Sequence, residues 1–324
     1  MQRRTFLQTV AAAWPAVATA KLKAAQIGAN TAFAGYGIVQ AIELLRKIDF
    51  PIIEIHSMGK PDPTPGVNPG FVFNELTAGQ KASIRSALKG VPHVTSHLPY
   101  TGQDYFAKDG AVAAAAGKVV DMAIEGSAYF GVEIAVLHPK PGGGQTLESQ
   151  WPIMIERIRR WGDLAKSHNL RIALETGYPP SIKDYVRLIQ EIDHPAVGAT
   201  IDVGHQSKYA ELVAKVRPED RGTPAGIRAY NDTTLAIVEA LGPKAIHFHI
   251  HDIEPATWAE HKPLGTGFVD YQRLFALLNK INYTGYLIFE IGGDAAKKEG
   301  YLRDGKKEIE AAIAQAAYST EGER

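Results

Sequence analysis

Histidines and carboxylates occupy the last positions of most of the short apolar segments in this sequence. These segment ends carry Asn30, His56, His97, His138, Glu175, Asp202, His249, His251 and Glu290. Their neighbours one residue away, such as Ile55, Leu137 and Leu174, are nearly all apolar. Because side chains alternate between the two faces of a strand, the polar ends share one face and the apolar neighbours the other. The pattern predicts a polar site where the carboxyl ends of the strands meet.

Four of these residues have the composition of a divalent-cation site. Glu175, Asp202, His249 and Glu290 offer three carboxylates and one imidazole, a set that suits Mn, Co, Mg or Zn. Without a cation, three buried carboxylates so close together would repel one another, and some would have to stay protonated. The sequence therefore predicts a divalent metal at these four positions.

The elements that must position these residues alternate along the chain. The candidate strands are 24–30, 52–56, 93–97, 132–138, 171–175, 197–202, 245–251 and 285–290. Helical patterns cover 36–48, 77–88, 111–129, 148–168, 235–241, 271–281 and 306–318, and a further helix opens at Ser181. This order predicts an α/β fold, a single closed (β/α)8 TIM barrel, with a doubly wound open sheet as the alternative. Residues 61–73 and 217–227 are rich in proline and glycine and are expected to be loops.

The composition excludes several functional classes. Lys plus Arg and Asp plus Glu both count 35, so the net charge is zero and no polyanion-binding surface is indicated. The absence of cysteine excludes disulfides, thiolate metal sites and a cysteine nucleophile. We therefore expect a small-molecule partner rather than a nucleic acid.

The first 20 residues have the features of an export signal. Arg3 and Arg4 precede Phe6 and a short apolar run, and residues 18–20 read Ala-Thr-Ala, a small-x-small cleavage pattern. The segment resembles a twin-arginine signal peptide, with a basic, alanine-rich tail as the alternative. We expect a periplasmic or secreted protein without membrane attachment after signal removal, a barrel over 21–318 and a frayed tail over 319–324. The oligomeric state stays open, a homo-oligomer included.

Five short stretches carry a family resemblance. They are His97-Leu-Pro-Tyr, Leu174-Glu-Thr-Gly, Ile201-Asp-Val-Gly-His, Phe248-His-Ile-His-Asp and Pro263-Leu-Gly-Thr-Gly. In order and spacing they resemble the xylose-isomerase-like TIM-barrel superfamily, which holds sugar phosphate isomerases and epimerases and the type IV apurinic endonucleases (AP endonuclease family 2).

The resemblance implies roles for individual residues. Glu175, Asp202, His249 and Glu290 fall on the family's metal ligands. His205 falls on a substrate-contacting position of the epimerases and on a metal ligand of the endonucleases, and His97 and His138 match histidines that bind extra zinc in the endonucleases.

The chemistry expected from this resemblance is proton transfer next to a carbonyl group. Glu175 and Glu290 are the candidate catalytic pair for a sugar isomerase or epimerase that works through a metal-stabilised enediolate. The expected substrate-binding residues are His97, His138, His205, His251 and Trp258. Trp258 is expected to stack on a sugar ring, with plain packing as the alternative reading.

Other functions stay open at this point. Pro255 and Ser181 stand where the ketose epimerases carry a substrate-binding Arg and Glu, so an oxidised sugar or glycoside is an alternative substrate, and lyase or hydratase chemistry an alternative reaction. A non-catalytic carbohydrate-binding barrel is a second alternative. A zinc phosphodiesterase of the endonuclease type is a third, although Ala259 replaces one of its carboxylate ligands.

Overall fold

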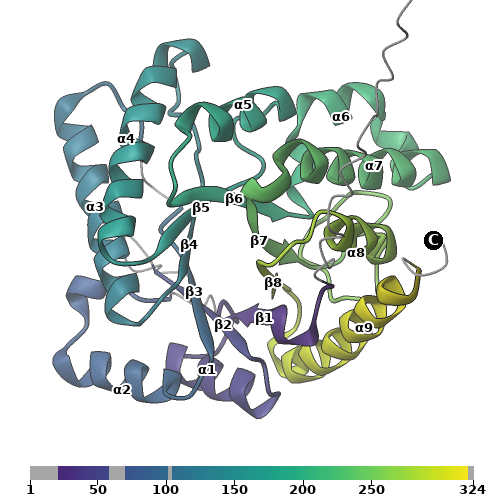
Figure 1. The fold of residues 1–324 in the computed structure, drawn as a ribbon, viewed down its shortest axis with the longest axis horizontal. Helices are drawn as coiled ribbons and strands as arrows, with labels where there is room; N and C mark the ends of the chain where they lie inside the picture. The colour runs from purple at the N-terminus through teal and green to yellow at the C-terminus, as the bar shows by residue number, and fades with distance from the viewer. Residues whose placement is uncertain (1–20, 58–69, 101–103, 320–324) are drawn as a thin grey trace, which may run out of the picture.

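Eight parallel strands close into a barrel in the computed structural model, which describes residues 21–57, 70–100 and 104–319 (Figure 1). The strands are β1 (Ile27–Asn30), β2 (Ile52–His56), β3 (His93–His97), β4 (Ile134–Leu137), β5 (Arg171–Glu175), β6 (Val197–Asp202), β7 (Ala245–Ile250) and β8 (Tyr286–Phe289). They pair in chain order, and β8 pairs with β1. The closed order confirms the (β/α)8 barrel and excludes the open sheet.

Helices surround the barrel as an outer layer (Figure 1). They are α1 (Ile38–Lys47), α2 (Ala78–Leu88), α3 (Gly110–Tyr129), α4 (Leu147–Ser167), α5 (Ile182–Ile192), α6 (Ala210–Lys215), α7 (Pro224–Leu241), α8 (Tyr271–Lys280) and α9 (Lys298–Ser319). Within the described ranges, no helix is long and apolar enough to cross a membrane. The segments predicted as a signal peptide, 1–20, and as the last residues of the tail, 320–324, lie outside the described residues.

Helix α5 shows how local sequence forms this layer. The Ser181 hydroxyl accepts a hydrogen bond from the Asp184 amide and so caps the helix. Tyr185, Leu188 and Ile192, spaced at three and four residues, are buried against the barrel. Each such buried side chain contributes about 1.5–3 kcal/mol to folding. Capping and spacing therefore act together to fix α5 behind β5.

Three predicted boundaries need correction. Residues Ala24–Gln26 form a 3-10 turn rather than the start of β1, and α9 begins at Lys298, eight residues before the predicted start. Helix α7 begins at Pro224, inside the predicted loop, since proline is tolerated in the first turn, where its missing N–H has no helical partner. Thr223 caps this helix by accepting a hydrogen bond from the Gly226 amide.

The core follows the alternation of the strands. Outward side chains such as Ile55, Leu137 and Leu174 are fully buried against the helices. A second, smaller cluster lies at α6 and α7 and consists of Leu212, Val216, Ala229, Tyr230, Ile253 and Trp258. Inward positions near the carboxyl ends carry the polar residues instead, so the barrel mouth holds the candidate chemistry.

Candidate metal centre and active site

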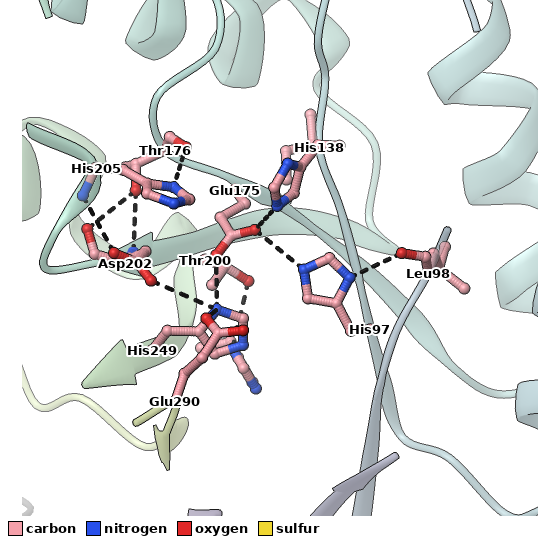
Figure 2. Close-up of polar contacts among 12 residues, drawn as sticks. His97, Leu98, His138, Glu175, Thr176, Thr200, Asp202, His205, His249 and Glu290 are labelled. Atoms are coloured by element: carbon pink, nitrogen blue, oxygen red, sulfur yellow. Dashed lines mark hydrogen bonds and ion pairs between the residues drawn. The ribbon is translucent and has the colours of Figure 1, made fainter. Parts of the chain in front are cut away.

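Four side chains from four strand ends converge at the mouth of the barrel. Glu175 ends β5, Asp202 ends β6, His249 lies in β7, and Glu290 directly follows β8. One ligand atom from each lies within 4.8 Å of those of the others. Figure 2 shows the four side chains directed toward one another. The set predicted from sequence as metal ligands is therefore assembled in space.

The His249 ring faces the carboxylates with its Nδ1 atom. This nitrogen lies 2.6 Å from Glu175 Oε1, 3.0 Å from Glu290 Oε2 and 3.9 Å from Asp202 Oδ2. On the other side of the ring, Nε2 lies 2.9 Å from Glu54 Oε1. A carboxylate behind a metal-binding histidine holds the proton on the far nitrogen and leaves the near lone pair for the ion. The arrangement fits a divalent cation among the four side chains.

Glu54 is a functional residue that the sequence analysis missed. It is fully buried in β2, and its second carboxylate oxygen lies 3.2 Å from His247 Nε2 and accepts a hydrogen bond from the Thr95 hydroxyl at 3.1 Å. A buried carboxylate is costly unless several partners neutralise it. Glu54 precedes His56 by two residues, so both side chains point to the inside of the barrel. Applying the alternation of strand side chains to the residue two positions before His56 would have identified Glu54.

The electrostatics of the centre are set by opposing effects. Burial alone would raise the pKa of Glu175 and of Glu290, but neighbouring imidazoles lower both well below the ordinary value. Burial alone would lower the pKa of His249, but Glu290, Glu54 and Glu175 raise it well above the usual range. Both glutamates are thus held as carboxylates, the form needed to bind a cation or accept a proton.

Two further predicted residues, His97 and His138, flank Glu175. His97 Nε2 lies 3.3 Å from Glu175 Oε2, and His138 Nε2 contacts the same oxygen (Figure 2). The Nδ1 of His97 donates to the Leu98 carbonyl at 2.7 Å, so Nε2 is the atom that faces the site. These two histidines and Glu175 form a second group with metal-ligand spacing.

His205 and His261 extend the site around Asp202. The Nδ1 of His205 donates to the Thr176 carbonyl at 2.8 Å, and together with Asp202 and His261 it forms a third group with metal-ligand spacing. His261 Nε2 also lies 3.7 Å from Glu290 Oε2. His205 thus lies at the mouth, as predicted.

Comparison of the sequence with protein families gives a result that agrees with the barrel fold. Residues 42–314 match the family model described as xylose isomerase-like TIM barrel. The chain belongs to the xylose isomerase-like TIM barrel family.

Solved structures of similar fold accompany this assignment. An L-ribulose 3-epimerase aligns with a TM-score of 0.65 at 16% identity, over 91% of this chain and 96% of its own. A D-tagatose 3-epimerase-like protein gives 0.64 at 17% identity, over 89% and 99%. A 3-keto-D-glucoside 4-epimerase from E. coli gives 0.62 at 18% identity, over 87% and 99%. A search of curated proteins gave no match.

Two residues predicted to bind substrate, His251 and Trp258, are buried in this xylose isomerase-like barrel. His251 is fully buried, its Nδ1 accepts a hydrogen bond from the His261 amide, and its Nε2 donates to Asp202 Oδ1 at 3.1 Å. With both nitrogens in use, His251 holds Asp202 rather than a substrate hydroxyl. Its place one residue after β7 suggested the mouth, but the ring lies behind Asp202.

Trp258 also lies away from the mouth. It is only 3% exposed and packs in the second hydrophobic cluster, with the Tyr230 ring centroid at 5.0 Å and the Arg221 guanidinium 4.9 Å from its own ring centroid. The structure therefore agrees with the packing alternative weighed for this residue.

Trp258→Ala is expected to lower the free energy of unfolding by about 3–5 kcal/mol, since it empties a packed aromatic site. Urea denaturation followed by circular dichroism measures this loss. A variant that unfolds like the wild type but binds sugar more weakly would restore the stacking role.

Proposed function

We propose that this chain is a divalent-metal-dependent sugar isomerase or epimerase that acts by carboxylate-mediated proton transfer. The observation that carries the proposal is the convergence of Glu175, Asp202, His249 and Glu290, with Glu54 orienting the histidine. The sugar epimerases among the similar structures support the reaction class.

Each group of residues at the mouth has a different role in the proposed reaction. A divalent cation held by the four side chains would supply Lewis acidity to a carbonyl oxygen of the substrate. Glu175 comes from the end of β5 and Glu290 from the end of β8, and both are held as carboxylates. One would remove the proton from the carbon next to the carbonyl, and the other would return a proton. His138, which is half-buried beside Glu175, would contact a substrate hydroxyl. His97 and His205 are buried and donate through Nδ1 to backbone carbonyls, so they would reach a hydroxyl only through Nε2.

The substrate class we propose is a keto-sugar or sugar derivative. Ser181, at the position of the expected glutamate, caps α5 and donates to Glu211 Oε1 at 3.0 Å, so it is not available to a substrate. Pro255 offers no charge at the position of the expected arginine. Both departures favour a substrate unlike a free ketose, and the 3-keto-D-glucoside 4-epimerase is one similar structure with such a substrate.

One observation favours a second candidate, a zinc phosphodiesterase. The His97–His138–Glu175 and Asp202–His205–His261 groups share carboxylates with the central four, as in a cluster of several ions. Ala259, which offers no ligand, and the zero net charge weigh against it. The number of bound ions separates the two candidates.

We further propose that residues 1–20 direct export through the twin-arginine pathway, on the pattern of Arg3, Arg4 and the Ala18-Thr19-Ala20 site. Fractionation of cells that express the full chain, beside an Arg3→Lys/Arg4→Lys variant, tests this. Export of the wild type alone supports the proposal.

Metal content per chain tests the proposed function. Elemental mass spectrometry is expected to find about one divalent ion in the wild type and a large loss in Glu290→Ala. Glu125→Ala, an exposed acidic position in α3, is the control and should keep the ion. Two or three zinc ions would favour the phosphodiesterase, and no ion after reconstitution would contradict the metal-dependent mechanism.

A further inference from the structure

Two buried polar side chains at the barrel mouth each have an atom that finds no hydrogen-bond partner among the described residues. They are Asn30, at Nδ2, and His56, at Nε2. Asn30 is 1% exposed and His56 is 4% exposed. A buried polar atom that stays unpaired costs stability, and such atoms are rare in folded proteins. These two polar side chains therefore lower the stability of the folded chain, and folding itself does not require them.

Both side chains point into the barrel. Asn30 pairs in register with Glu54, and His56 pairs with His97. Glu54 and His97 are inward residues because they contact His249 and Glu175 across the barrel. Register partners on adjacent parallel strands share a face, so Asn30 and His56 line the same interior.

Their position lies beside the proposed catalytic centre. The His56 ring centroid is 5.1 Å from that of His97, which is 5.8 Å from that of His249. On the other side, Ala29 pairs with Phe289, so Asn30 and Glu290 are the next residues on adjacent strands. Asn30 and His56 thus form the β1–β2 wall of the mouth, next to the proposed metal ligands.

The backbone holds His56 in place. The Phe71 amide donates to the His56 carbonyl at 3.1 Å. Gly70 has a positive φ, and a Cβ added there would lie 2.6 Å from that same carbonyl oxygen. Glycine is thus needed for the returning chain to lie against His56, and the backbone of His56 is fixed before any ligand arrives.

The hydrogen-bonding chemistry of this wall fits hydroxyl groups. The Ala32 amide donates to Asn30 Oδ1 at 3.3 Å, which leaves Nδ2 as a donor. Burial, with His97 adding to it, lowers the pKa of His56 to about 4, so its neutral ring can donate or accept at Nε2. With a neutral ring and an amide, this wall supplies no positive charge to pair with a phosphate or carboxylate.

We propose that Asn30 and His56 form a hydroxyl-recognition subsite that selects a neutral, unphosphorylated sugar. The subsite rests on the proposed function, because it positions the same substrate whose proton Glu175 and Glu290 would transfer. The hydroxyl groups of such a sugar would be the partners that Asn30 Nδ2 and His56 Nε2 lack among the described residues.

Sugar binding and thermal stability of His56 variants test the subsite. In His56→Leu, calorimetry with the best-binding sugar of a neutral keto-sugar panel is expected to show about 10-fold weaker binding. The melting temperature should stay unchanged or rise, because an unpaired polar group has been removed. His56→Gln, which keeps an amide donor and acceptor, should recover most of the affinity.

A matched control separates recognition from packing. His194 bonds Asp163 and the Ala196 amide before β6, away from the mouth, so His194→Leu should lower the melting temperature and keep sugar affinity. A His56→Leu variant with a lower melting temperature and unchanged affinity would overturn the subsite. Wild-type protein that binds sugar through His56 but exchanges no substrate proton would overturn only the proposed function. Wild-type protein that binds no sugar would overturn both.

Discussion

Replacement of either Glu175 or Glu290 by glutamine is expected to lower turnover of the sugar substrate by about 10²–10⁴-fold. Glutamine keeps the size of the side chain but cannot take up a proton at neutral pH. Both residues are held as carboxylates by neighbouring imidazoles, against the effect of burial. The measurement is turnover from each of the two interconverting sugars in deuterated water, at saturating metal, with deuterium uptake at the reacting carbon read by NMR.

The residual exchange reports which face of the substrate each carboxylate serves. If the two act on opposite faces, each variant should retain exchange from only one of the two sugars. Glu260→Gln is a suitable control, since this carboxylate lies near the mouth, 3.3 Å from Lys208 Nζ, but outside the central four. Full turnover in both the Glu175 and Glu290 variants would contradict the proton-transfer mechanism.

Glu54→Gln is expected to weaken metal binding by about 10–100-fold without removing any of the four ligands. The Glu54 carboxylate accepts from His249 Nε2 at 2.9 Å and so leaves Nδ1 directed at Glu175 and Glu290. An amide keeps only one oxygen, so His249 and His247 can no longer each lie against a carboxylate oxygen. Isothermal titration with Mn²⁺ measures the dissociation constant directly.

Thr95→Val provides a graded comparison for this effect. It removes only the hydroxyl that donates to Glu54 Oε2 at 3.1 Å, and keeps the carboxylate in place. We expect a change in metal affinity of only a few-fold, because this hydrogen bond acts on Glu54 and affects the ion only through His249. Equal affinity in Glu54→Gln and wild type would show that His249 needs no orienting partner.

The strands and the four central ligands could be predicted from sequence because they depend on a local period. Alternation of polar and apolar residues around Glu175 and Asp202 marks both the strand and its inward face. Once the strands are parallel and pair in chain order, their carboxyl ends lie at one end of the barrel, independent of the loop conformations. The four ligands therefore follow from the alternation of side chains along each strand and from the order of the strands in the barrel.

Other features could not be predicted because they depend on contacts between distant segments. His251 has the same local pattern as His249, but it turns behind Asp202, where the His261 amide holds it. Trp258 follows β7 in the chain, and only the packing of α6 and α7 against its loop buries it. Glu54 gains its role from His249, 195 residues away.

The sequence by itself determined the number and order of the strands and which residues face the barrel interior, since hydrophobic periodicity is a local property of the chain. Only the tertiary structure decided which polar residues touch the candidate centre, which support it from behind, and which, like Asn30 and His56, keep one buried atom without a partner among the described residues. The physical reason is that hydrogen bonding of a buried group depends on the distance and direction of its neighbours, and these are fixed only when the whole barrel has closed.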